Sequence, residues 1–177
     1  MGSHDEPGRN GHWARAAAER YERPLVLYTA RIVADADRAR DIVQEAFLRL
    51  CAQDEREVSG QLPQWLYAVC RNRALDVRRK ERRMSLLDDT QTEAFASTAP
   101  DPAHVAQHRD DSSNVLALLG ELPANQQEVI RLKFQHGLSY KQIAEVTQLS
   151  VSNVGFLIHT GLKTLRQRLS VNEQTKK

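Results

Sequence analysis

The sequence predicts an all-α fold in which a flexible acidic linker joins two small helical domains. Glycine and proline are scarce, and no segment alternates apolar and polar residues long enough to indicate a sheet. Apolar residues recur with helical spacing along residues 13–85 and again along residues 112–170. Between them, residues 86–111 lose that spacing and collect proline, serine, threonine and acidic residues, as linkers do.

In the first domain, the apolar spacing predicts three helices that share one small core. Two of them are expected at about residues 13–33 and 36–51. A polar loop is expected at residues 54–61. The third helix opens near Pro63, because proline suits the first turn of a helix.

Charge is unevenly distributed, although the formal net charge is only +2. The end of the third helix is rich in arginine, which indicates contact with nucleic-acid phosphates, and nearby aromatic groups can stack on an exposed base. The alternative is a solvated helix end, where the helix dipole also favours cations. Trp65 fits a core position equally well. The candidates for this nucleic-acid contact are Trp65, Arg71, Asn72, Arg73, Arg78, Arg79, Lys80, Arg82 and Arg83.

Two helices joined by a very short turn are predicted within residues 138–169. Ser139 and Gln142 are expected to form a capping box at the start of the first helix, and Ser150 is expected to cap the second helix. This pattern is typical of a helix-turn-helix, whose second helix enters the DNA major groove. The alternative is an ordinary helical hairpin in a bundle core.

The residue pattern of the second helix predicts one buried face and one face that points outward. Its buried stripe is expected to contain Val154, Ile158, Leu162, Leu165 and Leu169. We expect base reading from small polar, histidine and aromatic side chains, and phosphate contact from lysines. The DNA-binding candidates of this domain are Lys141, Ser152, Asn153, Phe156, His159, Thr160 and Lys163.

Nothing in the sequence predicts an enzyme. It shows no nucleophile with a base and an orienting group, and no phosphate-binding glycine loop. The histidines lack ligand spacing, and Cys51 and Cys70 fit helical patterns as small buried residues. No run approaches the ~18 apolar residues of a membrane span, and no signal peptide is recognisable. We therefore expect a cytoplasmic protein with no cofactor, no metal and no membrane insertion.

Three segments, in this order, resemble the extracytoplasmic-function (ECF) group of bacterial sigma factors in the sigma-70 family. The polymerase-clamp segment of that group is similar to DIVQEAFLRL, residues 41–50. The helix that opens and reads the promoter's minus-ten element is similar to WLYAVCRNRALDVRRKERR, residues 65–83. The domain that binds the minus-thirty-five element is similar to LPANQQEVIRLKFQHGLSYKQIAEVTQLSVSNV, residues 122–154. The resemblance covers roughly residues 15–170.

The resemblance implies a non-catalytic subunit of RNA polymerase that directs promoter recognition, DNA melting and transcription initiation. Its partners would be promoter DNA, the clamp of the largest polymerase subunit and the flap of the second-largest. Asn72 and residues 54–61 would lie near a flipped base of the minus-ten element, and an anti-sigma factor is a further possible partner. The residues that the resemblance assigns to polymerase binding are Asp37, Asp41, Gln44, Glu45 and Phe47.

One departure from the group lies at the start of the second helix. The group usually has acidic residues where this chain has Arg38 and Arg40, and the helix dipole disfavours cations at that end. Docking would weaken if the polymerase surface there is basic. Members with altered acids here depend on a Ser/Thr kinase, which makes Thr29 a nearby candidate hydroxyl. The alternative is that the remaining acids suffice.

A second departure lies in the recognition helix, which lacks the Lys and Arg that often follow the turn. Gly155 and Gly161 each cost ~1 kcal/mol of helix propensity relative to alanine. Each either permits close approach of a partner backbone or is tolerated by packing.

The linker bears on the function as well. Fully extended it spans roughly 85–90 Å, whereas as a free coil its ends average about 28–30 Å apart. The promoter elements lie more than one helical turn of ~34–36 Å apart, so polymerase is expected to hold the linker extended. The alternative function is a helix-turn-helix regulator outside polymerase, which would have no need for the arginine-rich helix.

Overall fold

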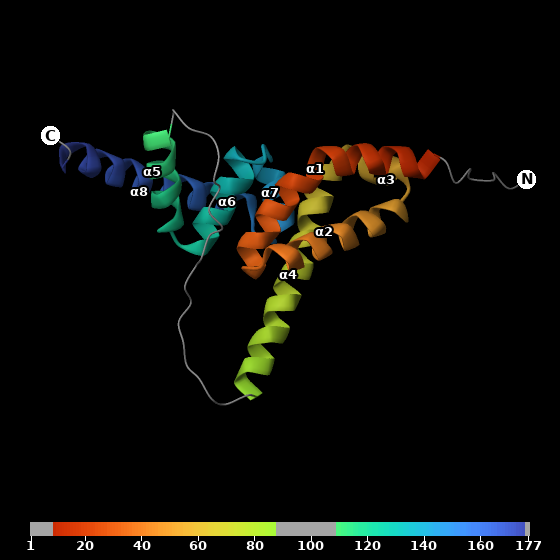
Figure 1. The fold of residues 1–177 in the computed structure, drawn as a ribbon. Coiled ribbons are helices and arrows are strands. Elements are labelled where there is room, and N and C mark those ends of the chain that lie inside the picture. Colours follow the sequence, from red (N-terminus) through yellow and green to blue (C-terminus); the bar gives the residue numbers. More distant parts are fainter. Residues whose placement is uncertain (1–8, 88–108, 176–177) are drawn as a thin grey trace, which may run out of the picture. The chain divides into compact units, whose positions relative to one another are not determined.

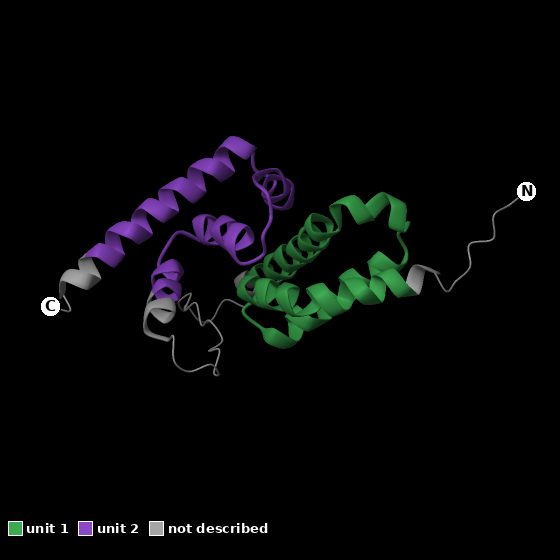
Figure 2. Cartoon of the chain, turned by 90° about the horizontal axis from the view of Figure 1, so that it is seen from above, with its two compact units in different colours: residues 1–100 green, residues 101–177 purple. Residues whose placement is uncertain are grey.

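The computed structural model describes residues 9–87 and 109–175, and every element in those two ranges is helical. The chain divides into two units, residues 1–100 and 101–177 (Figures 1 and 2). The prediction of an all-α chain with two helical domains is thus confirmed. Residues 88–108, which form most of the predicted linker, lie outside the described residues, so the linker stays a prediction. No helix in the described part has the length and apolar character needed to cross a membrane.

The first unit is built on three long helices that pack on one another in pairs. Its core includes an edge-to-face contact between Tyr28 and Tyr67, whose ring centroids are 5.2 Å apart. Leu25, Leu50 and Leu66, one from each of the three long helices, are fully buried as well. The elements are α1 (Arg9–Val33), α2 (Ala36–Cys51), α3 (Glu55–Val58), the 3-10 turn η1 (Ser59–Gln61) and α4 (Leu62–Leu87).

Helix α2 has the predicted bounds. The Asp35 carboxylate caps it by accepting the backbone N–H groups of Asp37 and Arg38, at 2.9 and 3.0 Å. Phe47 is only partly buried, and Cys51, which the sequence predicted to be a small buried residue, is exposed. Each follows directly after a buried position, which places it about 100° further round the helix at the edge of the packed face.

Residues 54–61 are not the loop that the sequence predicted. They form α3 and η1, with the Asp54 carboxylate accepting the backbone N–H of Arg56 at 2.9 Å. Val58 is buried and anchors this short stretch to the unit. An N-cap and one buried valine are therefore enough to make a polar segment helical.

The second unit packs three helices against one long helix. Helix α8 contacts α5, α6 and α7, and its ion pair between Arg168 and Glu121 adds a further link to the segment after α5. Helix α5 begins three residues earlier than the predicted start at Ser112. The elements are α5 (Arg109–Gly120), α6 (Ala124–Phe134), α7 (Tyr140–Thr147) and α8 (Val151–Thr175).

The end of α6 is a tight turn that contains a glycine. The helix stops at Phe134, and Gly137 follows in the left-handed region with φ of 71°. The Leu138 N–H returns to the Leu132 carbonyl at 3.0 Å. Phe134 is the last residue of the helix and is 61% exposed.

The buried face of α8 is broader than the predicted stripe. Leu157 is buried although the sequence analysis omitted it, whereas Leu162 and Leu169 are only partly buried. Because three helices contact α8 from different directions, a single stripe could not describe its packed surface.

The two glycines of α8 have different roles. A Cβ added to Gly161 would lie 2.6 Å from Cδ1 of Ile130, so this glycine lets α6 and α8 approach closely. A Cβ added to Gly155 would lie 3.7 Å from Cε2 of Tyr140, an ordinary contact. Close packing therefore requires glycine at position 161 and not at position 155.

Candidate nucleic-acid and polymerase interfaces

Helices α7 and α8 form the helix-turn-helix that the caps predicted. The Ser139 hydroxyl accepts the Gln142 N–H at 3.3 Å, and the Gln142 side chain accepts the Ser139 N–H at 2.8 Å. The Ser150 hydroxyl accepts the Asn153 N–H at 3.1 Å. Between the helices, Gln148 takes the left-handed conformation with φ of 60° and turns the chain. These local bonds fix the starts of both helices and the turn between them.

The outward face of α8 carries the predicted residues. Asn153, Phe156 and His159 are exposed, and Phe156 has 65% of its surface accessible. Thr160 is partly buried. The remaining predicted residues of this unit are all exposed, namely Lys141, Ser152 and Lys163. This face is therefore accessible, apolar in part and poor in charge.

Tyr140 is a surface residue that the sequence analysis did not identify. The Lys133 ammonium lies 5.5 Å from the centroid of the Tyr140 ring, and Gly155 of α8 lies beside the same ring. It stays 40% exposed, and Val151 at the start of α8 is also exposed. A sequence signal was available, because Tyr140 immediately follows the cap Ser139 and so opens the helix that supports α8.

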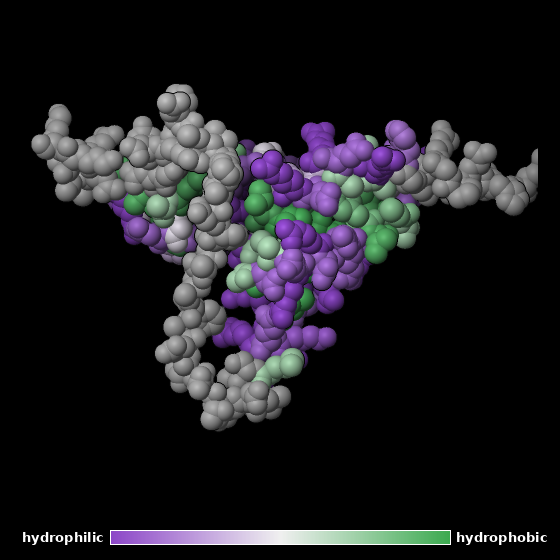
Figure 3. Space-filling view, viewed as in Figure 1, coloured by the Kyte–Doolittle hydropathy of each residue, from purple (hydrophilic) through white to green (hydrophobic). Residues whose placement is uncertain are grey.

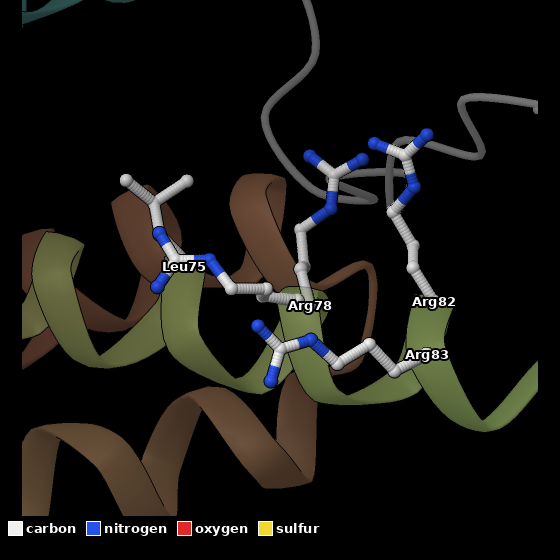
Figure 4. A pocket seen from close by; sticks show the side chains of 5 residues that line it. Leu75, Arg78, Arg82 and Arg83 are labelled. Atoms are coloured by element: carbon white, nitrogen blue, oxygen red, sulfur yellow. The ribbon is translucent and has the colours of Figure 1, made fainter.

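The second half of α4 carries a surface hollow surrounded by arginines (Figure 4). The side chains of Arg78 and Arg82, one helical turn apart, extend to the same side of the helix. Hydrophilic side chains dominate this half of α4 in the space-filling view (Figure 3). Arg79 is partly neutralised by Asp76 at 3.3 Å. The residues lining the hollow are Leu75, Arg78, Arg79, Arg82 and Arg83.

The rest of the predicted minus-ten residues are distributed around α4. Asn72 and Lys80 are exposed, whereas Trp65 and Arg71 are partly buried. Trp65 is therefore neither a fully buried core residue nor a fully exposed stacking group. The arginine hollow is the part of the predicted set that the structure brings together.

Arg73 faces α2 and is held within the unit. Its Nε donates to Oε2 of Glu45 at 2.8 Å, and Arg49 donates to the other carboxylate oxygen at 2.6 Å. The hydrogen bond from Arg73, followed by its charge and by the contacts of Arg49, holds the pKa of Glu45 below its usual range. The structure thus joins one predicted DNA-binding residue to one predicted polymerase-binding residue.

All five predicted polymerase-binding residues keep accessible surface on α2, although the Glu45 carboxylate is already bonded to two arginines. Asp37, Asp41 and Gln44 are exposed, and Phe47 is partly so. Leu48, which the sequence analysis did not select, is 72% exposed beside them. This face places apolar groups among polar ones, and protein–protein interfaces likewise combine an apolar core with a polar rim.

The two arginines at the start of α2 are paired within the unit. Arg38 lies 3.4 Å from Asp35 and also pairs with Glu81 of α4. Arg40 pairs with Asp37 one turn earlier. Their charges are thus balanced locally, which reduces the unfavourable charge that the sequence analysis expected at this helix start.

Thr29 is not an accessible phosphorylation site in the folded unit. Its side chain projects from α1, is 0% exposed and lies in the core of the first unit next to the buried Cys70. Burial raises the pKa of the Cys70 thiol to about 12, and the Thr29 hydroxyl acts on it in the opposite direction. The expectation that a kinase could modify Thr29 was wrong for the folded protein, because the sequence did not reveal which side of α1 is packed.

Comparisons with known proteins cover both units. Residues 17–84 match the family model Sigma-70 region 2, and residues 112–165 match the model Sigma-70, region 4. The chain is 31% identical over 160 residues to the ECF RNA polymerase sigma factor SigL of Mycobacterium tuberculosis, covering 88% of each protein. It is 26% identical over 158 residues to the ECF RNA polymerase sigma factor SigM of Bacillus subtilis, covering 87% of this chain and 94% of SigM.

A solved structure has the same fold. It is the sigma factor RpoE in complex with the anti-sigma factor NepR from Bartonella quintana. The TM-score is 0.64 at 21% identity, and the match covers 89% of this chain and 96% of that one.

Proposed function

This chain belongs to the ECF group of RNA polymerase sigma factors in the sigma-70 family, and we propose that it binds core polymerase in the cytoplasm and directs it to promoters. The single observation that carries the proposal is the ordered match of regions 2 and 4 to the two helical units. We further propose residues 13–85 and 112–170 as the working domains, with residues 86–111 as the linker that polymerase holds extended.

The outward face of α2 is the proposed docking surface for the polymerase clamp. Its acids and Gln44 supply polar contacts, while Phe47 and Leu48 supply apolar area that is free to be buried. Glu45 contributes less directly, because Arg73 and Arg49 already occupy its carboxylate. The flap of the second-largest subunit is the proposed partner of the second unit.

Helix α4 is the proposed minus-ten reader and the element that melts the DNA. The arginine hollow supports phosphate contact, because guanidinium groups bind phosphate oxygens with matched geometry. Asn72 is exposed and can hydrogen-bond an unpaired base, with α3 and η1 as the proposed neighbours of a flipped base. Melting would then be favoured because single-stranded bases gain contacts that the duplex cannot make.

Helix α8 is the proposed reader of the minus-thirty-five element in the major groove. Its first turns are exposed and carry Ser152, Asn153 and His159, which can reach base edges. Lys141 and Lys163 are exposed and supply the cationic side chains proposed for phosphate contact.

Regulation by an anti-sigma factor is proposed because the structural neighbour RpoE was solved with one. Activation by phosphorylation at a hydroxyl other than Thr29 is a second proposal, motivated by Arg38 and Arg40. Internal pairing of both arginines favours the simpler view that the unmodified protein binds polymerase. Full assembly of holoenzyme from unmodified protein would exclude phosphorylation as a requirement.

Co-purification with core polymerase, followed by run-off transcription on a selected promoter library, tests the function. We expect a stable complex and specific transcripts from it. We also expect weak duplex binding by the free protein, because its DNA-contacting faces are split between two units. Tight duplex binding without core polymerase, and no co-purification, would support the alternative of a regulator outside polymerase.

A further inference from the structure

The first three turns of α8 lack the side chains that usually read guanine. From Val151 to Leu162 the helix contains no arginine, lysine, aspartate or glutamate. Bidentate contact from arginine or lysine to guanine is the commonest specific contact in the major groove. A helix without either residue in these turns must select its bases in another way.

Large apolar groups are exposed at this end of the helix-turn-helix. We call Tyr140, Val151 and Phe156 the apolar patch; their exposed fractions are 40%, 48% and 65%. Val151 and Phe156 lie in the first two turns of α8, and the Tyr140 ring lies against Gly155 between them in sequence. Lys133 approaches the Tyr140 ring at 5.5 Å and helps to hold it in place.

Thymine offers the matching chemistry. In the major groove its C5-methyl group is the apolar feature that distinguishes it, whereas guanine and adenine present polar atoms. Asn153 lies in the same turns, is exposed, and can make two hydrogen bonds to adenine. Ser150 caps α8 through the backbone N–H of Asn153, so this amide side chain is not required for the cap.

We propose that α8 selects its promoter element by reading thymine methyl groups with the apolar patch and adenine with Asn153. The inference rests on the proposed function, since it names the bases that the minus-thirty-five reader takes. The same patch would otherwise be a protein-docking surface. Its continuity with exposed Ser152, Asn153 and His159 on the outward face of a helix-turn-helix favours DNA.

The test uses holoenzyme and a duplex carrying its selected promoter. Each thymine of the minus-thirty-five element is replaced in turn by deoxyuridine, which removes the methyl group and keeps the pairing edge. We expect affinity to fall about fourfold per methyl that is read, the equivalent of ~0.8 kcal/mol for one buried carbon group. For at least one thymine position, holoenzyme with Phe156→Ala is expected to bind the thymine duplex and the deoxyuridine duplex with equal affinity.

Phe134→Ala is the matched control, because Phe134 is a similarly exposed phenylalanine on α6 of the same unit. It is expected to keep the full preference for thymine over deoxyuridine. Phe156 is exposed, so its truncation should leave the folding transition in place, which circular dichroism checks.

The outcomes separate the two ideas. Holoenzyme that binds its promoter with no sensitivity to any thymine methyl overturns the inference and leaves the sigma-factor function standing. Loss of polymerase binding in Phe156→Ala, without a methyl effect in the unaltered protein, assigns the patch to a protein partner and also overturns it. Failure to form holoenzyme at all overturns the proposed function and this inference with it.

Discussion

The second half of α4 and the first turns of α8 are both proposed to meet promoter DNA, yet their surfaces differ in kind. Four arginines line the hollow on α4. The outward face of α8 presents Phe156, Asn153, His159 and small polar groups, and it carries no lysine, arginine or carboxylate before Lys163. Phosphate contacts supply affinity and salt dependence, whereas base contacts supply sequence choice. The comparison therefore assigns affinity mainly to α4 and selectivity mainly to α8.

The largest expected effect comes from removing charge at the hollow. In Arg78→Gln/Arg82→Gln, two phosphate contacts are lost, and the slope of log affinity against log salt should fall by about 1.8. The affinity difference between about 50 and 200 mM salt should then narrow roughly tenfold. Titrations of holoenzyme with promoter DNA across this range measure both quantities.

The control for this charge change is Arg20→Gln/Arg23→Gln, which alters two exposed arginine positions on α1. Its salt slope should stay close to that of the unaltered protein. An equal fall in both double variants would mean that general positive charge, and not the hollow, provides the affinity.

An effect of similar size is expected from Asn153→Ala, on promoter choice. We expect a loss of about 1–3 kcal/mol of discrimination at one base pair, because a bidentate amide contact disappears. The salt slope and the assembly of holoenzyme should not change. Selection from a promoter library measures the preference, with Gln167→Ala, an exposed amide further along α8, as the control. Abolished polymerase binding in Asn153→Ala would contradict the assignment of this face to DNA.

The two glycines test which part of α8 is constrained by packing. Gly155→Ala should raise the free energy of unfolding by up to ~1 kcal/mol, because helix propensity improves and the new methyl meets only ordinary contact. Gly161→Ala should lower it by about 1 kcal/mol, because overpacking against Ile130 outweighs the same gain. Denaturant unfolding of the intact chain, with hydrogen exchange in α6 and α8, reports both.

A compensating change sharpens the glycine experiment. Ile130→Val removes the Cδ1 atom that a methyl at position 161 would meet at 2.6 Å. The double variant Gly161→Ala/Ile130→Val should therefore lose less stability than the sum of the losses in the two single variants. Stabilisation of both single alanine variants to the same extent would show that α6 and α8 are not closely packed at Gly161.

The smallest expected effect concerns Arg73, whose guanidinium bonds to Glu45 and does not line the arginine hollow. In Arg73→Gln the pKa of Glu45 should rise toward its ordinary value, because the hydrogen bond and the positive charge of Arg73 are lost. Arg78→Gln should leave the pKa of Glu45 unchanged. Carboxyl chemical shifts followed by NMR during an acid titration distinguish the two variants.

The sign of the linked stability effect follows from the lowered pKa. The Glu45 contacts stabilise the fold above the unfolded-state pKa of the carboxyl, and this contribution is lost as the pH falls through the lower folded-state value. More than a third of each side chain is exposed, so solvent screening keeps the effect small. A salt slope that falls as much in Arg73→Gln as in Arg78→Gln would return Arg73 to the phosphate-binding face.

Local signals explain where prediction from the sequence succeeded. The bounds of α2 and the capping box of Ser139 and Gln142 depend on residues within one or two turns of each other. Residues 54–61 show the limit of such reasoning. Their polar composition indicated a loop, but the burial of Val58 against the unit favoured a helix.

The sequence by itself determined the helical class, the order of the two domains, the caps of the helix-turn-helix and the arginine-rich end of α4. These depend on composition, periodicity and neighbours along the chain. Only the tertiary structure decided that Thr29 is buried, that Arg73 binds Glu45, that Gly161 faces Ile130 and that Tyr140 lies against Gly155. These relations join positions on different helices or depend on which side of a helix is packed, and they form only when apolar faces are buried together.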